Sequence, residues 1–261
     1  MAAIVITGST KGIGRGLAEA FAARGHSVVV SGRSTDEVDA TAAKLPGAAG
    51  KVCDVCDPAQ VQALWNFAAE RFGTVDIWIN NAGFAITHKW TRDLTLAELR
   101  AMTETNLFGG IHGTQVALAG MERQGSGWIY TVLGGGSDGR QRDRFGGYGM
   151  TKIALRYYTD AMICETRTGP VNFGTILPGI LLSDGFLREA RQLDPQTWPK
   201  LARQLDMLAD RVEDVAPWLA EQVLAGGSRG RTIRWLTNGK ITGRMLAGMF
   251  GRKRGVVPQS L

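Results

Sequence analysis

The stretch from Thr7 to Gly16 reads TGSTKGIGRG, and it follows directly on a short apolar run, AIVI, at Ala3 to Ile6. Glycine has no Cβ, so a chain with glycines at positions 8, 12, 14 and 16 can turn tightly and approach an anionic ligand closely. A helical pattern from Ile13 to Arg24 follows the turn. This order of strand, turn and helix predicts helix amide groups that point at a bound phosphate, although a turn that binds nothing uses glycine in the same way.

The rest of the chain repeats the alternation of short apolar runs with longer helical patterns. The predicted strands are Ala3 to Thr7, Ser27 to Ser31, a short one at Lys51 to Cys53, Val75 to Asn80, Trp128 to Val132, Val171 to Leu177 and Thr232 to Leu236. The predicted helices are Ile13 to Arg24, Asp36 to Leu45, Pro58 to Phe72, Leu96 to Gln124, Tyr148 to Thr168 and Glu213 to Leu224. The alternation predicts an α/β Rossmann fold over residues 1–261, a single domain in which helices cover both faces of a doubly wound parallel sheet of about seven strands.

Composition limits the kind of ligand and compartment. The 261 residues carry a net charge of +6, a mild excess that suits anionic ligands and does not predict nucleic-acid binding. Three cysteines and no recognisable signal peptide predict reduced thiols and a cytoplasmic location. The pair Cys53 and Cys56 has no second pair, and the three histidines are scattered, so no metal site is predicted.

The end of the second predicted strand, SGRS at Ser31 to Ser34, indicates which dinucleotide binds. An NAD site usually places a carboxylate there, whereas this chain has Gly32 followed by Arg33. Lys11 in the glycine-rich turn supplies a second cation. The sequence therefore predicts NADP(H), with solvated surface cations as the alternative interpretation.

Tyr148 and Lys152 are four residues apart and share one face of a predicted helix. An ammonium beside a phenol favours the phenolate, so we expect Lys152 to lower the pKa of Tyr148. Tyr148 would then donate a proton to a carbonyl oxygen while a nicotinamide delivers hydride to the carbon. In isolation the same pair would suit a surface contact equally well.

The order of the motifs resembles the short-chain dehydrogenase/reductase family. They are TGSTKGIG at residues 7–14, Asp54, NNAG at residues 80–83, TNLFG around Asn106, YGMTK at residues 148–152, and Pro178-Gly179. The resemblance implies that Asp54 and Val55 hold the adenine, that Pro178 and Gly179 border the nicotinamide, and that Asn106 supports a water chain behind Lys152. The whole cofactor set becomes Gly8, Ser9, Lys11, Gly12, Ile13, Gly14, Arg33, Asp54, Val55, Asn81, Ala82, Gly83, Tyr148, Lys152, Pro178 and Gly179. It also implies a homodimer or homotetramer formed through the helices at residues 96–124 and 148–168.

The chain departs from the family where a serine is expected. The predicted fifth strand runs into Leu133 and Gly134 instead of a Ser-Ser pair. Ser137 lies in the glycine-rich loop that follows and is the preferred replacement, because an electrophilic hydroxyl must reach the substrate oxygen. Thr131 and Asp138 stay open as alternatives.

Two segments indicate a narrower kinship. The loop GGGSDGR before RFGGYGMTK, together with TIRWLTNGKITGRM near the end, is similar to the chlorophyll b reductase branch. That branch reduces a 7-formyl group with NADPH. A carbonyl reductase for a large apolar aldehyde or ketone is therefore the preferred function. The alternatives are a reductase of another alcohol or ketone, such as a 3-oxoacyl or steroid-like substrate, and a non-catalytic NADP(H) sensor or scaffold.

The region after Pro178-Gly179 is the predicted substrate lid. Residues 180–211 have amphipathic helical spacing, and Phe84, Ile86 and Trp90 would form the opposite wall of an apolar pocket, although ordinary core packing explains both stripes as well. The basic tail, at about residues 240–261, permits at most peripheral contact with a membrane. A cover over the pocket or a subunit contact is the preferred interpretation of this tail.

Overall fold

A computed structural model describes residues 1–194, 196–249 and 254–257 of the chain. Seven strands form one parallel sheet in the order β3-β2-β1-β4-β5-β6-β9, which confirms the predicted α/β fold. The strands are β1 (Ala3–Ile6), β2 (Ser27–Gly32), β3 (Ala48–Val52), β4 (Ile77–Asn80), β5 (Gly127–Val132), β6 (Val171–Leu177) and β9 (Arg231–Arg234). Strand order reverses between β1 and β4, and a ligand site forms at such a point in doubly wound sheets.

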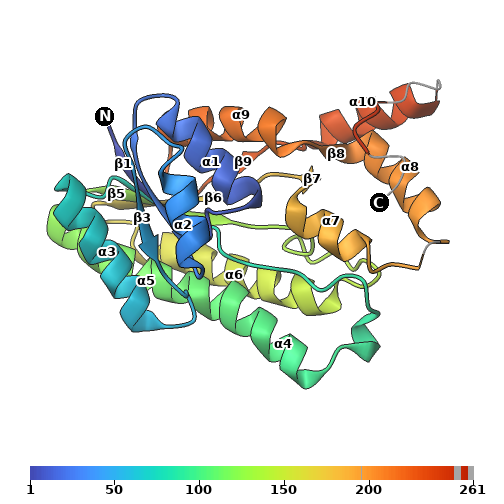
Figure 1. The fold of residues 1–261 in the computed structure, drawn as a ribbon, viewed down its shortest axis with the longest axis horizontal. Helices are drawn as coiled ribbons and strands as arrows, with labels where there is room; N and C mark the ends of the chain where they lie inside the picture. Colours follow the sequence, from blue (N-terminus) through green and yellow to red (C-terminus); the bar gives the residue numbers. More distant parts are fainter. Residues whose placement is uncertain (195, 250–253, 258–261) are drawn as a thin grey trace.

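Helices cover both faces of the sheet, as Figure 1 shows. On one face α1 (Gly12–Ala22) and α9 (Val212–Leu224) pack side by side over a core that includes Leu17, Phe21 and Leu219. On the other face lie α3 (Pro58–Phe72), α5 (Gly109–Gln124) and α6 (Gly146–Glu165). Helix α2 (Thr35–Ala42) packs beside β2 and β3. The central strands are buried along both faces, which explains their nearly continuous apolar sequence.

The predicted helix from Leu96 to Gln124 is interrupted. It consists of α4 (Leu96–Thr103), a π-helical turn η2 (Glu104–Phe108) and α5. The π turn leaves Asn106 fully buried, and such turns often occur at functional sites. A short 3-10 helix, η1 (Thr91–Asp93), precedes α4.

Residues 180–210 form a separate layer at the carboxyl edge of the sheet. Two short strands, β7 (Ile180–Leu181) and β8 (Ala209–Asp210), pair in parallel and enclose α7 (Asp184–Ala190) and α8 (Trp198–Leu208). Helix α10 (Asn238–Met249) contacts α8. In Figure 1, α7, α8 and α10 lie together at the end of the sheet opposite the N-terminus.

Candidate active site

The loops after β1 and β4 are tied together at the point where strand order reverses. The Thr7 hydroxyl accepts hydrogen bonds from the backbone amides of Asn81 and Ala82, at 2.9 and 3.1 Å. The Asn81 side-chain amide donates to the backbone carbonyls of Thr7 and Gly8, both at 2.9 Å. The structure therefore brings the predicted glycine-rich turn and the NNAG segment to one edge.

The glycine-rich turn has the backbone that an approaching phosphate requires. Gly8 and Gly12 have φ values of +63° and +55°, a conformation that favours glycine. Ser9 is fully buried, and its hydroxyl donates to the Ile6 carbonyl and accepts from the Ser31 amide. The side chain of Ser9 thus fixes the turn against β2, and Ile13 and Gly14 continue into α1.

The end of β2 has no room for the acid of an NAD site. A Cβ added at Gly32 would lie 2.9 Å from the Thr10 side chain, so an aspartate there would require the backbone or Thr10 to move. Arg33 is exposed beside it, and the Lys11 ammonium lies 2.6 Å from the Glu37 carboxylate. An acid at position 32 would therefore press against the Thr10 side chain.

Asp54 and Val55 follow β3 at the same edge. The Asp54 carboxylate accepts a hydrogen bond from the Cys56 amide at 3.0 Å, and Val55 is buried against Gly109. The three cysteines are free, and among the residues described no group of His, Cys, Asp and Glu gathers as metal ligands do.

Tyr148 and Lys152 project from the first turns of α6 into the edge. The Lys152 side chain is buried; its ammonium donates to the Val132 carbonyl at 3.1 Å and lies 5.8 Å from the centre of the Tyr148 ring. The i, i+4 spacing has therefore placed both groups on one helix face, as predicted. This face meets the end of β5.

The pKa of Tyr148 differs from the sequence expectation. Burial raises the pKa of the Tyr148 phenol to about 12 and lowers the pKa of the Lys152 ammonium to about 8. The expected lowering of the phenol pKa by the ammonium is therefore wrong for this structure. The physical reason is that both groups leave water together, and desolvation disfavours the charged form of each.

Three hydrogen bonds hold the Asn106 side chain between a loop and helix α6. Its side-chain oxygen accepts from the Phe84 amide at 2.8 Å, and its nitrogen donates to the Phe84 carbonyl at 2.8 Å and to the Thr151 hydroxyl at 3.1 Å. A Cβ added at Gly83 would lie 2.9 Å from the Asn106 oxygen and 3.6 Å from the Lys152 nitrogen. The structure thus joins Gly83, Asn106 and Lys152, which are far apart in sequence.

Gly134 occupies the place beside the phenol. A Cβ added at Gly134 would lie 2.2 Å from the Tyr148 hydroxyl oxygen, so a serine could not fit this backbone without displacing the tyrosine. The loop then runs along α6: Gly136 packs against Gly149, and the Ser137 carbonyl accepts from Arg156 at 3.4 Å. Ser137 is buried, and no hydrogen bond joins it to Tyr148 among the described residues.

The two alternative candidates for the missing hydroxyl have other partners. Thr131 bonds the Thr159 hydroxyl at 3.2 Å, and Asp138 binds Arg142 through both carboxylate oxygens, at 3.1 and 3.0 Å. The Arg142 guanidinium lowers the pKa of Asp138 to about 2. Both side chains therefore form hydrogen bonds with neighbouring residues of the protein.

The predicted lid, residues 180–211, follows Pro178 and Gly179, and Gly179 has φ +86°. Sequence analysis missed its attachments. The Glu189 carboxylate of α7 is largely buried, accepts from the Thr87 amide at 2.8 Å and lies 2.9 Å from the His88 ring nitrogen. This contact joins α7 to the loop that carries the predicted opposite wall. A lone glutamate on an amphipathic helix gives no sequence signal for such a contact, because the usual place of a glutamate is the solvated face.

The apolar stripes of the lid pack mainly against the lid itself. Leu205 and Trp198 are buried, and Phe186 and Leu201 pack against them. On the opposite wall Trp90 is 43% exposed, and the Arg144 guanidinium lies 4.8 Å from its ring. Ordinary core packing, the alternative interpretation of the lid, therefore explains part of the apolar stripe in α8.

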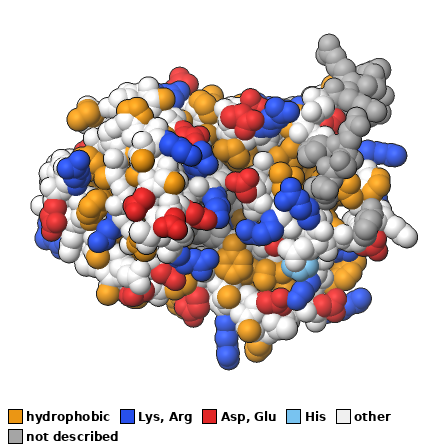
Figure 2. Space-filling view, viewed as in Figure 1, with side chains coloured by type: hydrophobic (Ala, Val, Ile, Leu, Met, Phe, Trp, Pro, Cys, Tyr) orange, Lys and Arg blue, Asp and Glu red, His pale blue; other side chains and the backbone are white. Residues whose placement is uncertain are grey.

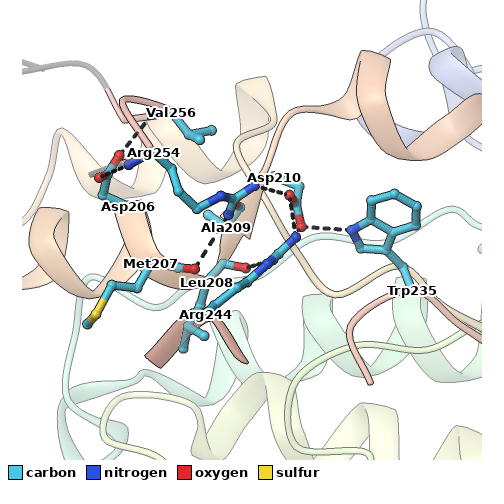
Figure 3. Close-up of polar contacts among 9 residues, drawn as sticks. All are labelled: Asp206, Met207, Leu208, Ala209, Asp210, Trp235, Arg244, Arg254 and Val256. Atoms are coloured by element: carbon cyan, nitrogen blue, oxygen red, sulfur yellow. Dashed lines mark hydrogen bonds and ion pairs between the residues drawn. The ribbon is translucent and has the colours of Figure 1, made fainter. Parts of the chain in front are cut away.

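Asp210 joins the lid to the tail, as Figure 3 shows. Its buried carboxylate accepts from Arg244 at 2.9 and 3.0 Å, from Arg254 at 2.6 Å and from the Trp235 indole at 2.7 Å. Asp206 accepts from the Arg254 and Val256 amides. Two arginines of the predicted basic tail are thus directed at the protein, while Arg252 and Lys253 lie outside the described residues.

The surface around this region carries both charge signs. In the view of Figure 2, acidic, basic and apolar side chains alternate across the face of the molecule. Within the described part of the chain, no helix is both long and apolar enough to cross a bilayer.

Comparison with known proteins identifies the family. The profile described as short chain dehydrogenase matches residues 2–193. The chain belongs to the short-chain dehydrogenase family. This dehydrogenase is 32% identical over 263 residues to an Arabidopsis thaliana protein named probable chlorophyll(ide) b reductase NYC1, chloroplastic, with 91% of this chain and 51% of the relative covered. It therefore spans about half the length of that relative.

Two further similarities have fuller coverage. A protein of Oryza sativa subsp. japonica, named chlorophyll(ide) b reductase NOL, chloroplastic, is 31% identical over 267 residues, which cover 96% of this dehydrogenase and 76% of the relative. The crystal structure of levodione reductase matches with a TM-score of 0.82 at 25% identity, covering 92% of this chain and 97% of that one. The resemblance to chlorophyll b reductases is confirmed, and the family to which the chain belongs is one of oxidoreductases whose fold binds a nicotinamide cofactor.

The predicted cytoplasmic location is contradicted by these relatives. Both chlorophyll(ide) b reductases carry the word chloroplastic in their names. The prediction depends on reduced cysteines and a missing signal peptide. Free thiols are compatible with any reducing compartment, so they do not distinguish one such compartment from another.

Proposed function

We propose that this short-chain dehydrogenase is an NADPH-dependent carbonyl reductase. The observation that supports it best is the meeting of the Tyr148 hydroxyl, the buried Lys152 ammonium and Asn106 at the edge where strand order reverses. A protein that only binds a dinucleotide has no need of a phenol proton donor beside a buried amine. Perturbed pKa values of this kind cluster at functional sites.

The residues at the edge fit a nicotinamide dinucleotide. Gly8 and Gly12 have the left-handed backbone conformation that a glycine-rich phosphate turn uses, and Gly83 lies against Asn106 close to Lys152. Gly12, Asp54 and Asn81 would hold the phosphates, the adenine and the nicotinamide side, together with the rest of the predicted set. When bound, the cofactor supplies hydride to the carbonyl carbon.

Tyr148 holds the proton that the substrate oxygen takes up. Its raised pKa keeps the phenol protonated throughout the neutral range, so it can act as an acid without a preceding ionisation step. Lys152 donates to Val132 and has its ammonium beside the ring, where it stabilises negative charge that develops on the phenol oxygen. Asn106 fixes the loop at Phe84 and Gly83 around them.

The preference for NADPH over NADH follows from the end of β2. Position 32 has no space for a carboxylate, and Arg33 is exposed next to it. A 2′-phosphate would therefore meet the cations Arg33 and Lys11, with no acid at position 32 to repel it. The proposed preference depends on residues of this chain, because the names of the relatives do not state a cofactor.

For the substrate we propose a large apolar formyl compound that resembles chlorophyll b. The names of the two plant relatives support this class, and so does the exposed Trp90 on the wall opposite the lid. Flat aromatic surface of this kind binds extended conjugated rings. Assembly into a homodimer or homotetramer stays a prediction.

One observation favours a second candidate, a non-catalytic NADP(H) sensor. Gly134 stands where most of the family carries the substrate-polarising serine, and the Tyr148 hydroxyl fills the space that a serine would need. A binder would tolerate this loss, whereas a reductase needs a second donor, for which Ser137 is our candidate.

Incubation with NADPH and a panel of aldehydes that includes a formyl tetrapyrrole separates the two candidates. We expect NADPH oxidation that depends on the aldehyde and is at least about tenfold slower with NADH at subsaturating coenzyme, since charge-assisted phosphate contacts are worth more than about 1 kcal/mol. Tight NADPH binding with no oxidation by any aldehyde would favour the sensor.

A further inference from the structure

Glu37 is an acidic group at the place where the 2′-phosphate of the proposed cofactor would bind. It lies in the first turn of α2, and one carboxylate oxygen is 2.6 Å from the Lys11 ammonium. The second oxygen accepts from the Thr10 hydroxyl at 3.4 Å. Lys11 and Thr10 belong to the glycine-rich turn, so Glu37 bridges from the α2 end of the site to the turn that holds the phosphates.

Glu37 is ion-paired with Lys11, which is one of the two cations proposed to bind the 2′-phosphate of the cofactor. Arg33 is exposed and forms no ion pair within the described ranges, whereas Lys11 is already neutralised by Glu37. A phosphate dianion that binds both cations must replace the carboxylate at Lys11 or lie beside it. Like charges brought together in this way weaken binding.

The exchange is energetically accessible. The side chains of Lys11 and Glu37 are 57% and 42% exposed, and exposed ion pairs contribute little to stability. Lys11 can therefore leave Glu37 for a more highly charged anion. The Glu37 carboxylate is ionised at neutral pH, because its hydrogen bond with Lys11 lowers its pKa.

We infer that Glu37 competes with the 2′-phosphate for Lys11 and so limits the preference of the protein for NADPH over NADH. This rests on the proposed function, in which NADP(H) is the cofactor. Glu37 acts as a specificity-determining residue: it restrains the affinity for the phosphorylated dinucleotide and leaves the affinity for the unphosphorylated one nearly unaffected. An alternative role exists for the same carboxylate, which is to accept the ribose 2′-hydroxyl of NADH.

The test measures dissociation constants of NADPH and NADH by titration calorimetry, without a carbonyl substrate. The variants are Glu37→Gln, the same substitution in a Lys11→Met background, and Asp36→Asn. Asp36 is the matched control, because it is an exposed acid in the same helix turn and makes the same change in net charge. Each titration is repeated at low and high salt.

We expect Glu37→Gln to tighten NADPH binding by at least about threefold, with NADH unchanged within about twofold, because Lys11 loses its competing carboxylate partner and can pair with the phosphate. The gain should shrink at high salt, since the groups are exposed, and should largely disappear in the Lys11→Met background. Asp36→Asn should change the NADPH affinity by less than about twofold.

Three results would overturn the inference. One is an unchanged NADPH affinity in Glu37→Gln; another is an equal gain in Asp36→Asn, which would indicate a general charge effect. The third is weaker NADH binding in Glu37→Gln, which would assign the carboxylate to the ribose hydroxyl. A parent protein that prefers NADH would contradict the proposed cofactor instead, and a failure to reduce aldehydes would contradict the proposed reaction, while the change in the affinity ratio still decides the role of Glu37.

Discussion

The edge of the sheet and the lid with its tail are built in different ways. At the edge, Tyr148 and Lys152 project from one helix face whose spacing is visible in the sequence. The side chains of Asn106 and Lys152 form hydrogen bonds with the backbone of the neighbouring loop and strand. In the lid and tail, short elements are joined by buried carboxylates, Glu189 and Asp210, to groups far along the chain.

The difference indicates which substitutions should change the chemistry and which should change the folding stability. A substitution at the edge removes a chemical group from a frame that many main-chain bonds hold in place. A substitution at Asp210 removes the common partner of Arg244, Arg254 and Trp235, and leaves two arginines without a carboxylate partner. The first should change chemistry with little effect on folding, and the second should do the reverse.

The largest effect should follow Tyr148→Phe. We expect kcat for aldehyde reduction to fall by about a thousandfold, in the range for loss of a positioned proton donor. The NADPH dissociation constant should stay within about threefold of the parent value, because the ring and its packing remain. Stopped-flow NADPH oxidation and calorimetry measure the two quantities, and a variant that turns over as fast as the parent would remove Tyr148 from the mechanism.

Asp210→Ala tests the other side of the comparison. Breaking one side of a buried charge network costs about 3 kcal/mol, so the free energy of unfolding in urea should fall by about that amount. Asp138→Ala is the control: its pair with Arg142 is more exposed and should be worth at most about 1 kcal/mol. Equal losses in the two variants would show that the Asp210 cluster contributes no more than a surface pair.

The pH dependence of reduction should report the Lys152 ammonium. Burial lowers its pKa to about 8, so the charged form that stabilises the phenolate is present below pH 8 and is lost above it. We expect kcat/KM for reduction to be level below pH 8 and then to fall, approaching tenfold per unit. The phenol stays protonated to about pH 12, so this decline belongs to the lysine. A level profile up to pH 10 would contradict the assignment.

The smallest effect expected is that of Ser137→Ala. If Ser137 supplies the second hydrogen bond to the substrate oxygen, kcat should fall by more than about threefold, corresponding to a loss above about 0.6 kcal/mol. The control is Thr159→Val, which removes the hydrogen bond from the Thr159 hydroxyl to the Thr131 hydroxyl. This variant tests whether looser packing under α6 is enough to slow the reaction. A Ser137→Ala rate within threefold of the parent would leave the Tyr148 phenol as the sole side-chain donor we assign.

Several elements of the edge were predictable because the signal is local. The order of strand, glycine turn and helix, the missing acid at position 32 and the Tyr148 to Lys152 spacing each depend on one short continuous stretch of sequence. The structure places all of them at one edge. The interruption of the 96–124 helix by a π turn was not predicted, because no proline lies within these residues to mark a break in the helix. The direction of the Tyr148 pKa was wrong for a related reason: spacing shows proximity and does not show desolvation.

The sequence by itself determined the alternating fold, the phosphate turn and the pairing of a phenol with an amine, because strand and helix periodicity act over short distances along the chain. Only the tertiary structure decided that Gly134 rests on the Tyr148 hydroxyl, that Glu37 holds Lys11, and that Asp210 gathers two arginines of the tail. These contacts join residues from separate elements, and the packing of the elements brings them together at distances that no spacing in the sequence encodes.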